Sequence, residues 1–164
     1  MTVSTQSPPE ASVRKTVLVN ASPDHTFRVF TDGMDTWWPR EHHVGNAPMK
    51  RVRIEGRTGG RCYTEHTDGS ESDWGLVLVW DPPRRLVPAW KINTSWKPES
   101  DLAKSSEVEV RFTREANGST RVDLEHRRFD HLGEAGETMR TGVDGTQGWG
   151  WLLQQFAEQA ARTE

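Results

Sequence analysis

The sequence predicts an α+β domain in which an antiparallel sheet of about six or seven strands packs against one long C-terminal helix. Residues 13–128 contain several runs in which apolar and polar residues alternate, as they do along strands with one buried face. The last ~25 residues instead carry an apolar stripe at helical spacing, formed by Trp149, Leu152, Leu153 and Phe156. Because an antiparallel sheet of this kind has one face to bury, the terminal helix can lie across it.

The composition fits one domain over residues 12–162 and argues against several classes of protein. The chain has 164 residues and a formal net charge of −3, and its acidic and basic residues are mixed, so no basic stripe indicates a nucleic-acid partner. No apolar run approaches the ~18 residues of a membrane span, and we interpret residues 1–11 as a disordered polar tail. Cys62 is the only cysteine, which excludes an internal disulfide and fits a cytoplasmic location.

A strand and two short helices open the domain. Valines alternate with polar residues over 13–19, which predicts the first strand. Ser22 then has the position of a helix N-cap and Pro23 that of the first helical residue. A second short helical turn carries Trp37 and Trp38 and is stopped by the proline that follows them. Both helices therefore precede the remaining strands.

The next strands are placed by their turn signals. Asp68-Gly69 is typical of a two-residue hairpin turn, which sets Tyr63 opposite Trp74 and Arg61 opposite Leu76. In this register Arg61 and Tyr63 share the sheet face of the tryptophan.

Residues 74–92 predict a second hairpin with an unusual number of indoles. A five-residue loop over 81–85 pairs Trp80 with Leu86 and Leu76 with Trp90. The large side chains then share one face, namely Trp74, Leu76, Leu78, Trp80, Leu86, Trp90 and Ile92. So much indole on one face predicts a deep interior or a pocket.

The apolar residues of the hairpin over 106–128 decide the register of its two strands. A two-residue turn would place the apolar residues of its two strands on opposite faces. A three-residue loop over 116–118 instead pairs Phe112 with Val122 and predicts a left-handed backbone near Gly118. It also places His126 opposite Val108, on the inner face.

Short motifs over residues 13–160 share their order and spacing with a known superfamily. They are Ala21-Ser22-Pro23 with Phe27, Trp37-Trp38-Pro39, Gly59-Gly60-Arg61, Trp74-Gly75, Trp80 to Leu86, and Gly148-Trp149. On these motifs the chain resembles the START-like, helix-grip superfamily (SRPBCC), and within it the homologues of the Hsp90 ATPase activator. The resemblance implies a curved sheet that grips the C-terminal helix around a cavity. Such proteins bind lipids, polyketides or other hydrophobic molecules, and some catalyse cyclisation or dehydration.

We therefore expect a mostly apolar cavity for a small hydrophobic or aromatic ligand. Its predicted lining is Trp38, Arg61, Tyr63, Trp74, Trp90, Leu124, His126, Trp149 and Phe156. No cofactor is expected, and no metal, because His42 and His43 are adjacent and lack the ligand spacing of a zinc site. We expect a monomer or a homodimer.

His126 is the candidate for chemistry, and its role stays open at this point. It is either the general base of a cyclase or dehydratase or a structural histidine with satisfied hydrogen bonds. Cys62 has no evident base nearby and is interpreted as buried filler at a position that is often aromatic in relatives. A third hypothesis, a chaperone-accessory or stress-related interaction module, requires an exposed apolar patch instead of a cavity.

Overall fold

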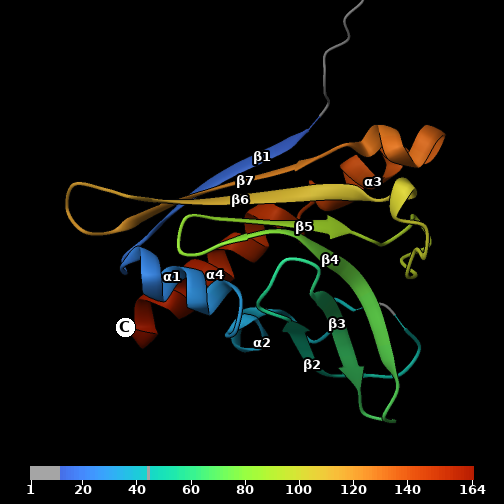
Figure 1. Ribbon diagram of the computed structural model, residues 1–164, viewed down its shortest axis with the longest axis horizontal. Helices are drawn as coiled ribbons and strands as arrows, with labels where there is room; N and C mark the ends of the chain where they lie inside the picture. The colour runs from blue at the N-terminus through green and yellow to red at the C-terminus, as the bar shows by residue number, and fades with distance from the viewer. Residues whose placement is uncertain (1–11, 44) are drawn as a thin grey trace, which may run out of the picture.

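Seven antiparallel strands form one sheet that curls around the C-terminal helix in the computed structural model (Figure 1). The structure describes residues 12–43 and 45–164, so the predicted tail over 1–11 lies outside the described residues. The strands are β1 (Val13–Val19), β2 (Met49–Ile54), β3 (Arg61–His66), β4 (Glu71–Asp81), β5 (Arg85–Trp90), β6 (Ser106–Arg114) and β7 (Thr120–Arg127). Their order is β1-β7-β6-β5-β4-β3-β2, and the predicted α+β helix-grip fold is confirmed.

Helices cover the concave face of the sheet. They are α1 (Pro23–Phe30), α2 (Met34–Trp37), α3 (Gly136–Val143) and α4 (Trp149–Thr163), and 3₁₀ turns lie at Leu102–Lys104 and Phe129–Ala135. The predicted start of α1 is confirmed, because the Ser22 hydroxyl accepts a hydrogen bond from the backbone N–H of His25 and Pro23 is the first residue. In Figure 1, α4 crosses the sheet with α1 beside it.

The C-terminal region differs from the single long helix that the sequence predicts. A turn separates α3 from α4, and Gly148 forms the N-cap of α4. A Cβ at Gly148 would lie 2.0 Å from the backbone oxygen of Val143, so the chain passes too close to itself there for any other residue. The break matters because residues 145–148 of the α3–α4 turn line the hollow described below.

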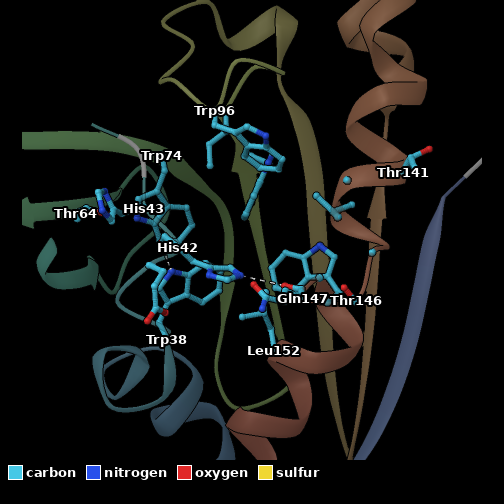
Figure 2. Close-up of a pocket in the computed structure, with 18 residues that line it drawn as sticks. Trp38, His42, His43, Thr64, Trp74, Trp96, Thr141, Thr146, Gln147 and Leu152 are labelled. Atoms are coloured by element: carbon cyan, nitrogen blue, oxygen red, sulfur yellow. Dashed lines mark hydrogen bonds between the residues drawn. The ribbon is translucent and has the colours of Figure 1, made fainter. Parts of the chain in front are cut away.

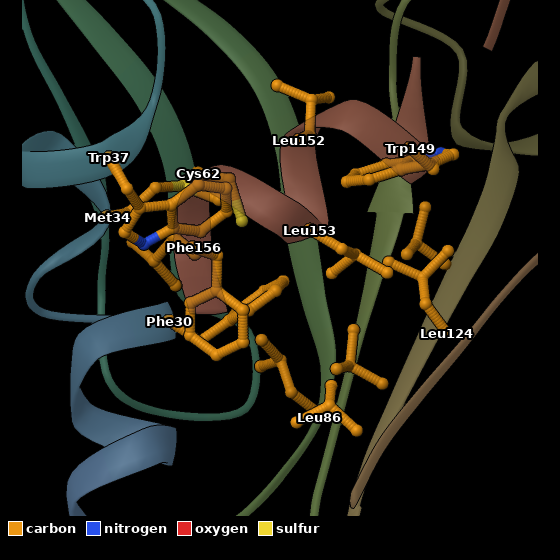
Figure 3. Packing of buried hydrophobic residues seen from close by; sticks show 14 of the residues in the cluster. Phe30, Met34, Trp37, Cys62, Leu86, Leu124, Trp149, Leu152, Leu153 and Phe156 are labelled. Carbon is orange, nitrogen blue, oxygen red and sulfur yellow. The ribbon is translucent and has the colours of Figure 1, made fainter. Parts of the chain in front are cut away.

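One end of the concave face is filled by packed aromatic side chains. The Phe156 ring of α4 is fully buried and lies 5.1 Å from the Phe30 ring and 5.2 Å from the Trp37 ring, measured between centroids. Phe27 packs edge-on against Phe112 of β6 and Trp80 of β4. Figure 3 shows Phe30, Trp37 and Phe156 of this cluster between α1, α4 and the sheet. The core therefore holds α4 firmly at this end.

The predicted turn between β3 and β4 is wrong. The loop has three residues, 67–69, because the backbone N–H of His66 donates to the Ser70 oxygen and Gly69 has φ +89°. Tyr63 therefore pairs with Asp73, and Trp74 is an extra, unpaired residue of β4 before Gly75 pairs with Cys62. This β-bulge restores the predicted pair of Arg61 with Leu76.

The bulge also changes which side chains face inward. Cys62 and Thr64 are buried on the inner face of β3, whereas Arg61, Tyr63 and Glu65 alternate with them on the outer face and are only partly buried. The prediction that Arg61 and Tyr63 share the face of Trp74 is therefore wrong. A one-residue register change moves a whole strand's side chains to the other face.

A second bulge lies at Leu78 of β4. Val77 pairs with Pro88 and Val79 with Val87, so Leu78 is left without a partner in the β4–β5 ladder. The predicted pair of Trp80 with Leu86 is confirmed. Beyond the bulge, Trp90 pairs with Gly75 and Leu76 with Ala89, so the predicted pair of Leu76 with Trp90 is wrong, and Leu76 lies on the outer face with Arg61.

The β6–β7 hairpin matches its prediction throughout. Its loop has three residues, 116–118, and Gly118 has φ +88°. Phe112 pairs with Val122, and His126 pairs with Val108 on the inner face. The inner face of the sheet is thus continuous from the aromatic cluster to His126.

Candidate functional site

A hollow of about 650 Å³ lies between the sheet, the loop after α2 and the α3–α4 turn (Figure 2). Its indole walls are Trp38, Trp74, Trp90 and Trp149. Exposed residues from two separate segments, Glu41 and 145–147, lie at its rim. The fold therefore leaves one end of the concave face hollow, opposite the end that the phenylalanines fill.

The four indoles contact one another around the hollow. The Trp38 and Trp74 rings are nearly parallel, 5° apart, with centroids separated by 6.3 Å. Trp90 meets Trp74 at 6.1 Å and Trp149 at 5.5 Å, in edge-on contacts. These separations lie within the favourable range for aromatic pairs, ~4.5–7 Å. The walls are therefore a connected set of rings contributed by α4, β4, β5 and the end of α2.

Two loops meet across the mouth of the hollow. The Nε2 atom of His42 lies 3.1 Å from the backbone oxygen of Gln147, a hydrogen bond between the loop after α2 and the α3–α4 turn (Figure 2). The Trp38 indole N–H donates to the backbone oxygen of His42 at 2.6 Å. Trp96, 48% exposed, lines the same rim with its ring close to Gly142. Two hydrogen bonds to backbone oxygens and one exposed indole therefore form part of the rim.

His126 lies behind the indole wall. The predicted inward orientation is confirmed, but the imidazole is completely buried and does not line the hollow. Burial lowers its pKa to about 3, so the ring is neutral. Its Nδ1 accepts from the Trp149 indole N–H at 3.0 Å, and Nε2 therefore carries the proton, 2.7 Å from the Ser106 hydroxyl. His126 fixes the orientation of Trp149 and has no open path to a ligand.

The remaining predicted lining residues lie elsewhere. Leu124 and Phe156 face inward but are buried in the packed core and do not line the hollow. On the outer face, the Arg61 guanidinium lies 4.0 Å from the centre of the Tyr63 ring and 2.7 Å from an Asp73 oxygen. Trp38, Trp74, Trp90 and Trp149 are thus the predicted residues that the structure brings together around the hollow.

The rim residues are absent from the predicted lining. His42 and His43, considered above only as metal ligands, line the hollow, as do Thr141, Thr146 and Gln147. The available signal was the glycine-rich stretch 142–150, which the chain needs in order to turn sharply before α4.

Cys62 and His66 are buried, and the described residues offer no metal-binding group. Cys62 is fully buried, and burial raises the pKa of its thiol to about 12, so it stays protonated. His66 bonds to the Ala47 oxygen and the Ser72 hydroxyl, at 2.9 and 2.8 Å. Residues 12–43 and 45–164 contain no group of three His, Cys, Asp or Glu residues that could hold a metal ion. Over the same residues, no helix has the length and apolarity to span a membrane.

The chain matches a known protein family over most of its length. The family described as Activator of Hsp90 ATPase homolog 1-like protein matches residues 20–161. The chain belongs to this family. Its predicted place in the helix-grip superfamily, near the Hsp90 ATPase activator homologues, is confirmed. No curated protein matches the chain.

Solved structures with this fold include two of substantial sequence identity. "An anthrahydroquino-Gama-pyrone synthase Txn09 complexed with SUM" is 37% identical with TM-score 0.64, and the match covers 93% of this chain and 99% of that one. "A self-sacrificing resistance protein, CalC from Micromonospora echinospora" is 31% identical with TM-score 0.63, over 92% and 94% of the two chains. Protein NE0264 from Nitrosomonas europaea, 15% identical with TM-score 0.64 over 92% and 94%, shares the fold alone.

Proposed function

We propose that this protein binds a small, planar aromatic molecule in the indole-lined hollow. The observation that carries the proposal is the convergence of Trp38, Trp74, Trp90 and Trp149 on one hollow of about 650 Å³. Ligand sites commonly have volumes of ~300–1,000 Å³ and mostly apolar walls with a few polar groups. Each well-placed aromatic pair adds ~0.5–1.5 kcal/mol beyond the burial of apolar area. A flat aromatic ligand can form the most such pairs with these walls.

One of the two more identical structures named above supports this ligand class. It is named as a synthase of an anthrahydroquinone–pyrone product, which is a fused aromatic ring system. Its identity of 37% over almost the whole of both chains supports related ligand chemistry for this chain. We also expect the protein to act in the cytoplasm, as a monomer or a homodimer.

A ring-closing or dehydrating enzyme in the same hollow is the second candidate. The name of the similar synthase favours it. Because His126 is buried behind Trp90 and Trp149, a base for this reaction would come from the rim, where His43 and Glu41 lie. For the third hypothesis, the described residues offer Leu18, Trp96 and Leu102 as exposed large hydrophobic side chains. Leu18 lies on β1, whereas Trp96 and Leu102 lie in the connection between β5 and β6.

The test of ligand binding compares two tryptophan variants. We expect Trp38→Ala to weaken the binding of a hydroxyanthraquinone such as emodin about tenfold, because it removes one stacking wall. Trp80→Ala is the matched control, since Trp80 packs on Phe27 and does not line the hollow, and it should change Kd by about twofold or less. Quenching of indole fluorescence measures both. Equal losses, or no saturable binding to the wild type, would refute the proposal.

Product analysis separates the binding protein from the enzyme. A bound molecule that is recovered chemically unchanged supports binding alone. Turnover of an open-chain polyketide precursor to a cyclised product, abolished by His43→Ala and retained in His126→Gln, supports the second candidate.

A further inference from the structure

Most deeply placed indole N–H groups around the core have a built-in acceptor. Trp37 and Trp38 donate to backbone oxygens at 2.9 and 2.6 Å, and Trp149 donates to the Nδ1 atom of His126 at 3.0 Å. This is the ordinary state of a buried donor, because a buried polar group without a partner destabilises the fold. The fold therefore supplies a hydrogen-bond acceptor for each of these three indole N–H groups.

Trp74 and Trp90 are different. Their side chains are 7% and 6% exposed, their Nε1 atoms are shielded from solvent, and neither nitrogen has an acceptor within the part of the chain that the structure describes. The other buried side-chain atoms of this kind there are the hydroxyls of Ser12 and Ser105, which do not line the hollow. The two unpartnered indole donors thus coincide with the walls of the candidate site.

We propose that the ligand carries hydrogen-bond-accepting oxygens on its planar aromatic frame, and that the Trp74 and Trp90 N–H groups donate to them. The chemical class is a polycyclic aromatic with carbonyl oxygens, such as a quinone or a pyrone. This inference rests on the proposed function and adds the chemistry that the hollow selects. Neither N–H group is exposed to the hollow in this structure, so a ligand oxygen would reach them after a small rotation of the two rings, and both rings border a second void of about 10 Å³.

The proposal predicts a preference that apolar walls alone would not give. A carbonyl oxygen loses its hydration when it enters an apolar site, so indole walls without donors would favour a hydrocarbon over a quinone of the same shape. Two N–H donors that are already shielded from water reverse this order. Each hydrogen bond to a ligand oxygen satisfies a buried donor and a buried acceptor together. Tighter binding of the quinone than of the hydrocarbon would therefore indicate that the indole N–H groups donate to the ligand.

The experiment compares anthraquinone-2-sulfonate with anthracene-2-sulfonate, which share ring size and charge. By calorimetric titration we expect the quinone to bind about tenfold more tightly. Replacing Trp74 and Trp90 with 3-benzothienylalanine keeps the shape of each ring and substitutes sulfur for the N–H group. In Trp74→benzothienylalanine and Trp90→benzothienylalanine proteins the preference should shrink to about twofold or less. The same replacement at Trp80, outside the hollow, should leave it unchanged.

The outcomes separate this inference from the proposed function. If both probes bind the wild type equally, or the hydrocarbon binds better, the donor role is refuted while the aromatic site stands. A preference that survives both replacements refutes it as well. If neither probe binds, the proposed function fails and this inference fails with it. Movement of the Trp74 and Trp90 indole proton resonances to higher frequency with the quinone alone supports it directly.

Discussion

His126 shows how a side chain can face a site and still have no access to it. It pairs with Val108 on the inner face, as the alternation of β7 predicts, yet Trp90, Trp149 and Phe129 pack around its ring. Alternation specifies the face of a sheet, whereas the residue that covers that face comes from another part of the chain. The shape of the hollow therefore depends on the orientation of the Trp149 ring, which the hydrogen bond to His126 fixes.

The buried imidazole predicts a distinct dependence of stability on pH. Because the pKa of folded His126 is about 3 and that of an unfolded histidine is about 6.5, only the unfolded chain takes up this proton between those values. The stabilisation is complete above pH 6.5 and is lost as the pH falls toward 3, at roughly 1.4 kcal/mol per pH unit. Urea unfolding of wild type and His126→Gln over this range measures the difference. Parallel curves for the two proteins would show that His126 is accessible to protons.

Gly75 allows the close approach of β4 to its neighbours beside the Trp74 bulge. A Cβ there would lie 2.7 Å from the Ala89 oxygen and 3.0 Å from the Cys62 Cβ. We expect Gly75→Ala to lower the free energy of unfolding by about 2 kcal/mol or more. Gly150→Ala is the control, because its nearest neighbour is the flexible Lys15 Cε at 3.9 Å and alanine favours helix by up to ~1 kcal/mol. Equal effects would contradict the tight packing at the bulge.

At the scale of elements, sequence alone predicts the β6–β7 hairpin in full and the β3–β4–β5 region only in part. The apolar residues alternate without interruption from Val108 to Phe112 and again from Val122 to Leu124, so one loop length satisfies both strands. In β4 the extra residues Trp74 and Leu78 each change the register by one, which pattern counting does not detect. Because of the bulge at Trp74, this tryptophan lies on the inner face as predicted, whereas Tyr63 lies on the outer face.

The outer face of the sheet contains a charge cluster that joins three strands. Glu109 of β6 has a side chain only 5% exposed, and its carboxylate bonds to Arg111 at 2.8 Å and to Arg85 of β5 and Arg127 of β7 at 2.5 Å. Burial opposes ionisation of Glu109, but hydrogen bonds from the three arginines outweigh it and lower the pKa to about 2. The charged form is therefore stabilised by folding.

Removal of the Glu109 carboxylate should destabilise the sheet. We expect Glu109→Ala to cost roughly 3 kcal/mol, since it leaves the three arginines facing one another. The control Glu107→Ala, which removes a more exposed partner of Arg127, should cost about 1 kcal/mol or less. In the wild type this stabilisation is complete above pH 4.5 and is lost as the pH falls toward 2. Chemical denaturation measures both variants, and losses of similar size would contradict the cluster.

The whole molecule divides the space between its sheet and α4 into a packed half and a hollow half. Phe27, Phe30 and Phe156 fill the first, while the break before Trp149 lets the α3–α4 turn stand away from the sheet over the second. The sequence could predict Trp74 and Trp90 as walls from their positions on strands, and Trp149 from the apolar stripe of the terminal helix. It could not predict the rim, because His42 and Gln147 meet only through the tertiary fold.

An indole proton–nitrogen correlation spectrum recorded during titration with anthraquinone-2-sulfonate tests the central claim most directly, because each of the eight tryptophans reports separately. The account predicts saturable shifts for Trp38, Trp74, Trp90 and Trp149, with Trp80 unchanged at the packed end. Shifts that spread to Trp80 as strongly as to the walls, or that never saturate, would contradict a ligand site in the hollow.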